Sequence, residues 1–172
     1  MSGFIDTELQ FLILCFTTLF TVINPLGITP IFVVMTERFT LDDRLKIAKK
    51  GVSTGTITLL VFTILGSIIF KLYGITVEAF QIMGGILFFR SGLRMLEAKV
   101  GRTRTTDTEQ EEFKETGDAD EIAISPIGIP LITGPGAITG VMLLSAKTPT
   151  TYSLGTLLVA VLITMTIFYY IL

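Results

Sequence analysis

Two short segments rich in proline and glycine interrupt apolar parts of the sequence. The first reads Asn24-Pro25-Leu26-Gly27-Ile28 and the second Ser125-Pro126-Ile127-Gly128-Ile129, at an offset of 101 residues. Proline lacks an amide hydrogen and clashes with the preceding helical turn, while glycine adopts backbone dihedrals that other residues avoid. The sequence therefore predicts two broken helices that share one pattern.

The chemistry open to these breaks follows from their unpaired backbone groups. Such groups cost several kcal/mol each at membrane depth, so they must face the protein interior or a wet cavity. There, the first amides of a half-helix attract a carboxylate, and free carbonyl groups accept hydrogen bonds from an ammonium group. We expect a substrate site built from Asn24, Pro25, Gly27, Thr29, Ser125, Pro126, Gly128, Thr133, Gly134 and Gly136.

Three further polar residues are candidates for lining the cavity. Thr17 and Thr21 lie one helical turn apart and lead into the first break, and Gln81 is the only amide side chain of its apolar segment. Two alternatives stay open for these residues. The threonines can instead bond their own backbone or neighbouring helices, and Gln81 can hydrogen-bond another helix. Asn24 and Ser125 can also cap the half-helices that follow them, which is compatible with a substrate contact.

The residues that are absent narrow the function. The chain has no histidine, one cysteine and a net charge of −2, and no acidic residue lies deep in an apolar segment. Metal sites and proton relays use such groups, so we expect no metal, no other cofactor and a neutral or zwitterionic ligand. A coupling sodium ion or proton stays open. No basic patch indicates nucleic acid, and no nucleophile–base pair indicates an enzyme.

Long uncharged blocks predict an all-α membrane protein whose main partner is the lipid bilayer. Half of the residues are hydrophobic and only 16% are charged, against about a quarter in soluble domains. Runs of about 18 or more apolar residues are long enough to cross the hydrocarbon core as helices. Four such runs, together with a weaker apolar segment at 78–96, give five expected spans at residues 9–35, 51–70, 78–96, 122–146 and 152–172.

The positive charges predict the orientation. Of the 13 lysine and arginine residues, all but Lys71 and Lys147 fall between the first and second spans or at the end of the third span and beyond it. Cytoplasmic loops carry an excess of lysine and arginine. We therefore expect the loops at 36–50 and 97–121 in the cytoplasm and the N-terminus outside.

An acidic segment at 100–121 divides the chain into two halves and is typical of a cytoplasmic linker. The first half, 1–99, holds three spans, so a second unit that begins at 122 starts on the opposite side of the membrane. Inverted repeats with a broken first helix are a recurrent design of secondary transporters. The second unit, 122–172, has two spans where the repeat requires three. This difference favours a missing sixth span, although Tyr169 and Tyr170 could form an interfacial belt that ends the protein.

Three groups of residues resemble the MarC family of bacterial and archaeal inner-membrane proteins, also described as small neutral amino acid transporters. They are Thr21–Gly27 with Pro30-Ile31-Phe32, then Gln81–Phe88, and finally Pro126–Leu131 with Gly134–Ile138. The resemblance covers nearly the whole chain outside the acidic segment. It implies two inverted three-span repeats, an outside N-terminus and transport of amino acids such as glycine or alanine across the inner membrane. The five spans of this chain depart from the six of the family.

Three functions compete at this point. The first is secondary transport of small neutral amino acids. The second is a passive channel, or a transporter of another small solute, that uses the same breaks. The third is a structural membrane protein or an inactive truncated paralogue. Any of the three is compatible with a homo-oligomer.

Overall fold

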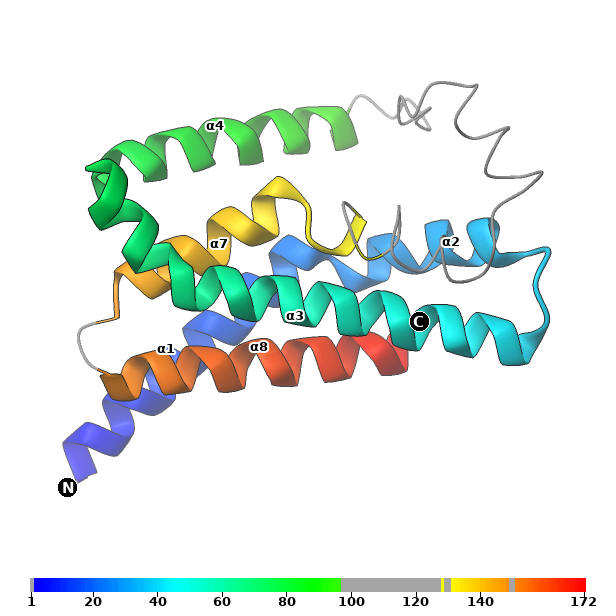
Figure 1. The fold of residues 1–172 in the computed structure, drawn as a ribbon, viewed down its shortest axis with the longest axis horizontal. Coiled ribbons are helices and arrows are strands. Elements are labelled where there is room, and N and C mark those ends of the chain that lie inside the picture. The colour runs from blue at the N-terminus through cyan, green and yellow to red at the C-terminus, as the bar shows by residue number, and fades with distance from the viewer. Residues whose placement is uncertain (1, 97–127, 129–130, 149–150) are drawn as a thin grey trace.

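The structure, a computed structural model, describes residues 2–96, 128, 131–148 and 151–172. The described residues form helices and no strand, which confirms the predicted all-α class. The helices of the described residues are α1 (Ser2–Ile23), α2 (Pro25–Thr36), α3 (Leu41–Tyr73), α4 (Val77–Leu96), α7 (Pro135–Ala146) and α8 (Thr151–Ile171), and they are labelled in Figure 1. The acidic segment 100–121 lies outside the described residues.

Three helical segments of the described chain are long and apolar enough to cross a bilayer. They cover Asp6–Thr36, which joins α1 and α2, then Leu41–Gly66 and Tyr152–Ile171. The third expected span corresponds to α4, which carries Glu78, Arg90 and Arg94 and is not among the three. The described part of the fourth expected span includes α7, a shorter apolar helix of 12 residues.

The start of α3 corrects one predicted boundary. The sequence predicted a loop at 36–50 and a span from 51, whereas α3 begins at Leu41 and only residues 37–40 separate it from α2. Thr40 caps the helix: its hydroxyl oxygen accepts from Asp43 N (3.3 Å) and its hydroxyl donates to Asp43 Oδ2 (2.8 Å). Charged residues exclude these turns from the hydrocarbon core, but they do not exclude them from a helix.

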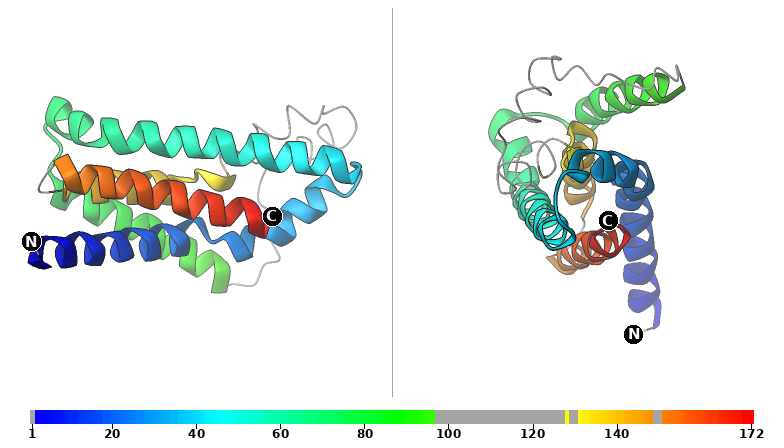
Figure 2. Two further views of the ribbon diagram at one scale, coloured as in Figure 1. Left: turned by 90° about the horizontal axis from the view of Figure 1, so that it is seen from below. Right: turned by 90° about the vertical axis from the view of Figure 1, so that its right-hand side faces the viewer.

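The helices pack as a bundle in which α7 is central. It contacts α1, α3 and α4, while α8 packs against α1 and α3. In Figure 1, α1 and α8 run from left to right, and α3 and α7 run in the opposite direction. Figure 2 shows α8 beside both α1 and α3, with α4 at the edge of the bundle. One buried core joins all of these helices except α4; it includes Cys15, Leu19, Leu59, Val141, Leu157 and Phe168.

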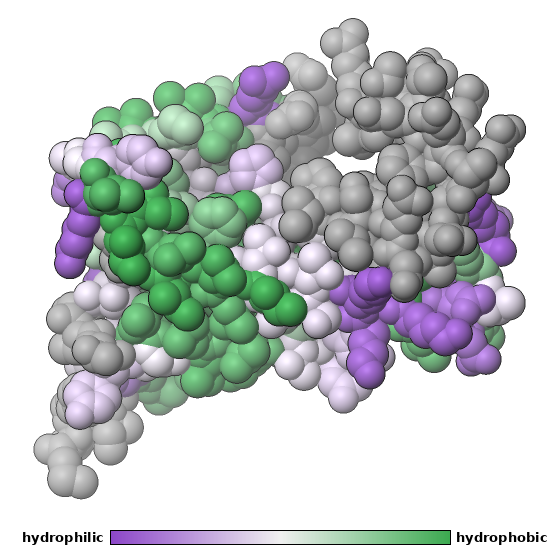
Figure 3. Space-filling model, viewed as in Figure 1, coloured by the Kyte–Doolittle hydropathy of each residue, from purple (hydrophilic) through white to green (hydrophobic). Residues whose placement is uncertain are grey.

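The outer surface suits lipid. Large apolar side chains are exposed along the bundle, among them Leu14, Val34, Ile64, Ile86 and Leu162. Figure 3 shows hydrophobic residues over the left part of one face and a cluster of hydrophilic residues toward its lower right, with smaller hydrophilic groups at the left edge and the top. The broad hydrophobic area matches a membrane protein.

Glycines let α7 approach its neighbours closely. A Cβ atom on Gly66 of α3 would lie 3.2 Å from the Cα atom of Met142, and one on Gly84 of α4 would lie 2.7 Å from Thr139 Cγ2. The hydroxyl of Ser145 also donates to the Thr63 carbonyl (2.7 Å), which links α7 to α3 inside the core. Small residues at contact points are the usual means of packing membrane helices.

The neighbouring glycines of α4 provide a matched test of this packing. Gly84→Ala is expected to destabilise the protein by about 1–3 kcal/mol, because the new methyl group meets Thr139. Gly85→Ala places its methyl group where nothing lies within 4 Å, so a neutral effect or a gain of about 1 kcal/mol is expected. The stability of both variants is measured by thermal unfolding in detergent, monitored through thiol labelling of the buried Cys15 as it becomes accessible. Equal effects of the two changes would contradict the close contact.

Candidate functional site

The first break is centred on Asn24, which lies between α1 and α2. Its backbone has φ 51° and ψ 64°, and it is the only non-glycine residue in the described chain with positive φ. Asparagine tolerates this left-handed conformation better than most residues. Its Oδ1 accepts from Gly27 N (3.2 Å), and its carbonyl accepts from Gly27 N (3.0 Å) and Ile28 N (3.1 Å). Asn24 thus ends α1 and caps α2.

The residues after Asn24 complete this local structure. Pro25 is buried at the first position of α2, where its missing amide hydrogen does no harm. Gly27 is exposed and must lack a side chain, because a Cβ atom there would collide with Asn24 Nδ2. Thr29 is half-buried, and its hydroxyl donates to the Pro25 carbonyl (2.9 Å). The Asn-Pro-x-Gly pattern is therefore explained by the geometry of the turn.

The second break is described from its middle onward, since Ser125 and Pro126 lie outside the described residues. The buried Gly128 carbonyl accepts from Thr133 N (3.4 Å) and from the Thr133 hydroxyl (3.0 Å), which closes a turn wider than that of an α-helix. Gly134 then precedes α7, and no side chain caps it. Within the described residues, the amides of Gly136 and Ala137 in the first turn therefore have neither an intrahelical partner nor a side-chain cap.

The two breaks adjoin each other at half-buried positions. A Cβ atom on Gly136 would lie 2.9 Å from Phe88 Cε1 of α4 and 3.4 Å from Val22 Cγ1 of α1. The first turn of α7 therefore packs against the end of α1, two residues before Asn24. On the other side, a Cβ atom on Gly55 of α3 would lie 2.8 Å from Ile132 Cγ2 and 3.3 Å from Met165 Cε of α8. This places the uncapped end of α7 beside the interrupted end of α1.

The remaining candidate residues are more scattered. Thr17 and Thr21 are exposed, and their hydroxyls donate within α1 to the carbonyls of Ile13 (2.8 Å) and Thr17 (2.8 Å). Thr133 is only 2% exposed, so its hydroxyl serves the turn described above. Gln81 is half-buried on α4, the helix that packs against α7. Of the candidate residues described, Asn24 and Gly136 lie nearest to the junction of the two breaks.

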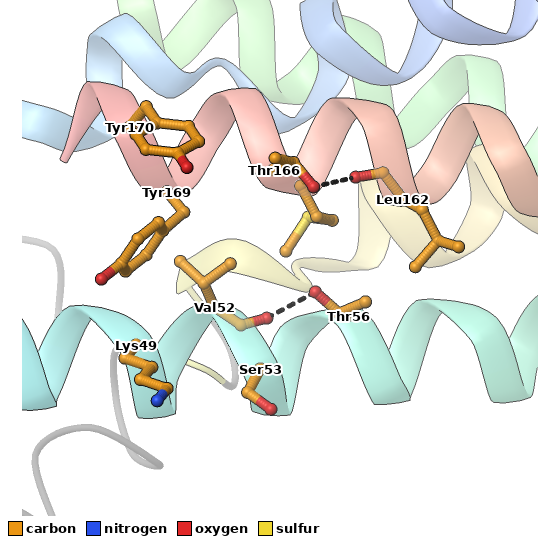
Figure 4. A pocket seen from close by; sticks show the side chains of 9 residues that line it. Lys49, Val52, Ser53, Thr56, Leu162, Thr166, Tyr169 and Tyr170 are labelled. Atoms are coloured by element: carbon orange, nitrogen blue, oxygen red, sulfur yellow. Dashed lines mark hydrogen bonds between the residues drawn. The ribbon is translucent and has the colours of Figure 1, made fainter.

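Two surface cavities lie away from this junction. One, of about 350 Å³, lies between α3 and α8 and is shown in Figure 4. The other, of about 380 Å³, surrounds the turn from α3 to α4 and includes Phe70, Lys71 and Glu78. None of the described residues of either break lines these two cavities. Within the described chain, no three histidine, cysteine or acidic side chains gather as metal ligands.

One polar cluster was missed by sequence reasoning. The half-buried Glu8 carboxylate of α1 accepts from the Ser153 hydroxyl (2.9 Å) and the Thr156 hydroxyl (2.6 Å) of α8. The carboxylate lies at the N-terminal end of α8, where a negative charge is favourable. Its partners are 145 and 148 residues away, so no local pattern could have indicated the pairing.

These features define an integral membrane protein built from several helices, with two irregular segments that lie next to each other. The chain belongs to the MarC family, since the model for MarC family integral membrane proteins matches residues 9–172. A UPF0056 membrane protein of Methanocaldococcus jannaschii is 38% identical over 91% of this chain and 68% of its own length. Another from Pyrococcus abyssi is 42% identical over 73% of this chain and 59% of its own.

The bacterial relatives include the UPF0056 membrane protein YvbG of Bacillus subtilis, 37% identical over 80% of this chain and 64% of its own length. The chain thus spans roughly two thirds of the length of the relatives it matches. No solved structure matches the chain.

Substitutions at Asn24 separate its backbone role from its capping role. Asn24→Gly keeps the left-handed conformation and is expected to change stability by only a few tenths of a kcal/mol. Asn24→Ala loses the Oδ1 cap and strains the backbone, so a loss of about 2–3 kcal/mol is expected. Thermal unfolding in detergent measures the difference. If Asn24→Gly were as unstable as Asn24→Ala, the left-handed backbone conformation would not be what restricts the residue at this position.

The Glu8 cluster gives a second stability test. Glu8→Ala removes the acceptor of two hydroxyl groups and is expected to destabilise the contact of α1 with α8 by about 1–3 kcal/mol. Asp6→Ala, two residues earlier on an exposed position, is the control and should change stability by less than about 0.5 kcal/mol. Equal melting temperatures for the two variants would argue against the cluster.

Proposed function

We propose that this chain forms the substrate site of a secondary transporter for small neutral amino acids such as glycine or alanine. The observation that carries the proposal is the junction of the two breaks, where Gly136 of α7 approaches Val22 of α1. Transporter sites are commonly formed where interrupted helices meet near the centre of the membrane.

The backbone at the junction offers groups for both ends of a zwitterion. The uncapped amides of Gly136 and Ala137, at the positive end of the α7 dipole, suit the substrate carboxylate. The Thr21 carbonyl loses its intrahelical donor because the residue four positions later is Pro25, and it suits the substrate ammonium group. Asn24 Oδ1 is occupied by the cap, which leaves its Nδ2 amide as the side-chain donor toward the carboxylate.

Small substrates fit the composition of this region. The described residues at the junction are mainly Asn24, glycines and apolar side chains, with no charged group among them. A substrate with a net charge would have no partner there, whereas a zwitterion is neutral as a whole. Glycines on both sides favour a substrate with a small side chain. A coupling sodium ion or proton would supply the driving force.

The inverted repeat and the orientation belong to the same proposal. The broken pair α1–α2 and the helix α7 run in opposite directions along the bundle, as an inverted repeat requires (Figure 1). We assign the lysine-rich start of α3 to the cytoplasmic side of a bacterial or archaeal inner membrane and the start of α1 to the outside. Alternating access would then come from movement of one repeat against the other.

Uptake of labelled glycine or alanine into proteoliposomes tests the proposal. We expect accumulation that depends on a sodium or proton gradient and falls at least tenfold in Asn24→Leu, because the donor at the junction is lost. Thr58→Val is the control, since the Thr58 hydroxyl donates only to the Thr54 carbonyl within α3 (2.9 Å). Flux without any gradient dependence would indicate a channel. Absence of flux, or full activity of Asn24→Leu, would contradict the proposed site.

A further inference from the structure

The groove between α3 and α8 has the shape and polarity of a lipid site. It measures about 350 Å³ and is lined by Lys49, Val52, Ser53, Thr56, Leu162, Met165, Thr166, Tyr169 and Tyr170. In Figure 4, Tyr169 reaches from α8 toward α3, opposite Val52. The groove opens beside the exposed Leu162 and Ile163, on the surface that faces lipid. A ligand in it would therefore contact both protein and bilayer.

The groove carries a positive charge from Lys49. Among the described residues, Lys49 is the only charged one that lines the groove, and the Asp43 carboxylate of the same helix is paired with Lys46 (3.1 Å). The cavity at the other end of α3 differs, because Lys71 there shares the lining with Glu78. An anion is therefore favoured in the first cavity and not in the second.

Polarity changes along the groove in the way that a phospholipid requires. Lys49 and the paired rings of Tyr169 and Tyr170 lie at one end, where lysine and tyrosine typically meet the membrane interface. Seven residues separate Lys49 from Thr56, which corresponds to roughly 10 Å along the helix. The groove therefore descends from the interface toward the hydrocarbon core.

The deeper end is apolar despite its threonines. The Thr56 hydroxyl donates to the Val52 carbonyl (2.7 Å), and the Thr166 hydroxyl donates to the Leu162 carbonyl (2.7 Å). Both hydroxyl protons are thus used within their own helices, and the floor is completed by Val52, Leu162 and Met165. This surface suits a hydrocarbon chain.

We propose that the groove binds one anionic phospholipid, with its phosphate at Lys49 and an acyl chain along Val52, Leu162 and Met165. The lysine-rich end faces the cytoplasm by the positive-inside rule, and the cytoplasmic leaflet supplies anionic lipids. Met165 and Ile132 both lie against Gly55 of α3. An acyl chain on Met165 would therefore lie close to the second break, to which Ile132 belongs. This site is independent of the transport function proposed above.

The absence of tryptophan from the chain permits a direct test. Leu162→Trp places a single fluorescent reporter in the groove, and Ile64→Trp places one on the exposed face of α3 outside it. Each variant is reconstituted with phosphatidylcholine mixed with brominated phosphatidylglycerol or brominated phosphatidylcholine. Bromine quenches tryptophan only at contact, so quenching reports which lipid occupies the site.

We expect the Leu162→Trp reporter to show about fivefold preference for the anionic lipid, since one lysine near the surface contributes about that factor. Adding Lys49→Gln should reduce the preference to about one, whereas Lys71→Gln should leave it unchanged. The Ile64→Trp reporter should show no preference. Equal quenching by the two lipids at Leu162 would overturn the proposal, as would weak quenching by both, which would mean that protein covers the groove.

Native mass spectrometry of the unmodified chain provides a second measurement that needs no tryptophan. One phosphatidylglycerol should stay bound after detergent removal, and Lys49→Gln should lose it while Lys71→Gln keeps it. Identical lipid retention by all three proteins would contradict the assignment to Lys49.

Discussion

The need to satisfy every backbone polar group away from water is the constraint on which this structure depends. A helix meets that need by itself, so each interruption must supply substitutes. At Asn24 the substitutes come from one residue, whose side chain and carbonyl both accept from the start of α2. At the second break, Gly128 and Thr133 close part of the turn, while the first amides of α7 stay without a cap. Among the described residues the two breaks are thus unequal, and the end without a side-chain cap lies on the α7 side.

The close packing of α7 follows from its central position. A helix of 12 residues is too short to cross the bilayer unaided, and it is held by α1, α3 and α4 on its sides. Glycines at Gly66 and Gly84 bring these neighbours near, and the Ser145 hydroxyl joins α7 to α3. Because lipid offers no hydrophobic force between helices, such contacts have to supply the stability.

The parts of the fold that local chemistry determines could be predicted from the sequence. Apolar blocks gave the helical membrane class, and the Asn-Pro-x-Gly pattern located the interruption at Asn24. The predicted start of α3 was wrong because the charged residues at 42–50 were assigned to a loop. The helix in fact begins after its N-cap at Thr40 and continues through these charged residues. Glu8 and its hydroxyl partners, and the groove beside Lys49, depend on contacts of α8 with helices far away in the sequence, α1 and α3. No short pattern encodes those contacts, so only the folded arrangement reveals them.

The left-handed backbone at Asn24 also restricts how this position can change during evolution. From an asparagine codon, a single base change leads to aspartate, serine, threonine, lysine, histidine, isoleucine or tyrosine. Aspartate keeps the cap but adds a charge in the membrane, and most of the others disfavour the conformation or lose the acceptor. Glycine, which fits the backbone, requires two base changes. Both the backbone geometry and the genetic code therefore restrict substitution of Asn24, and replacement of this asparagine during evolution should be slow.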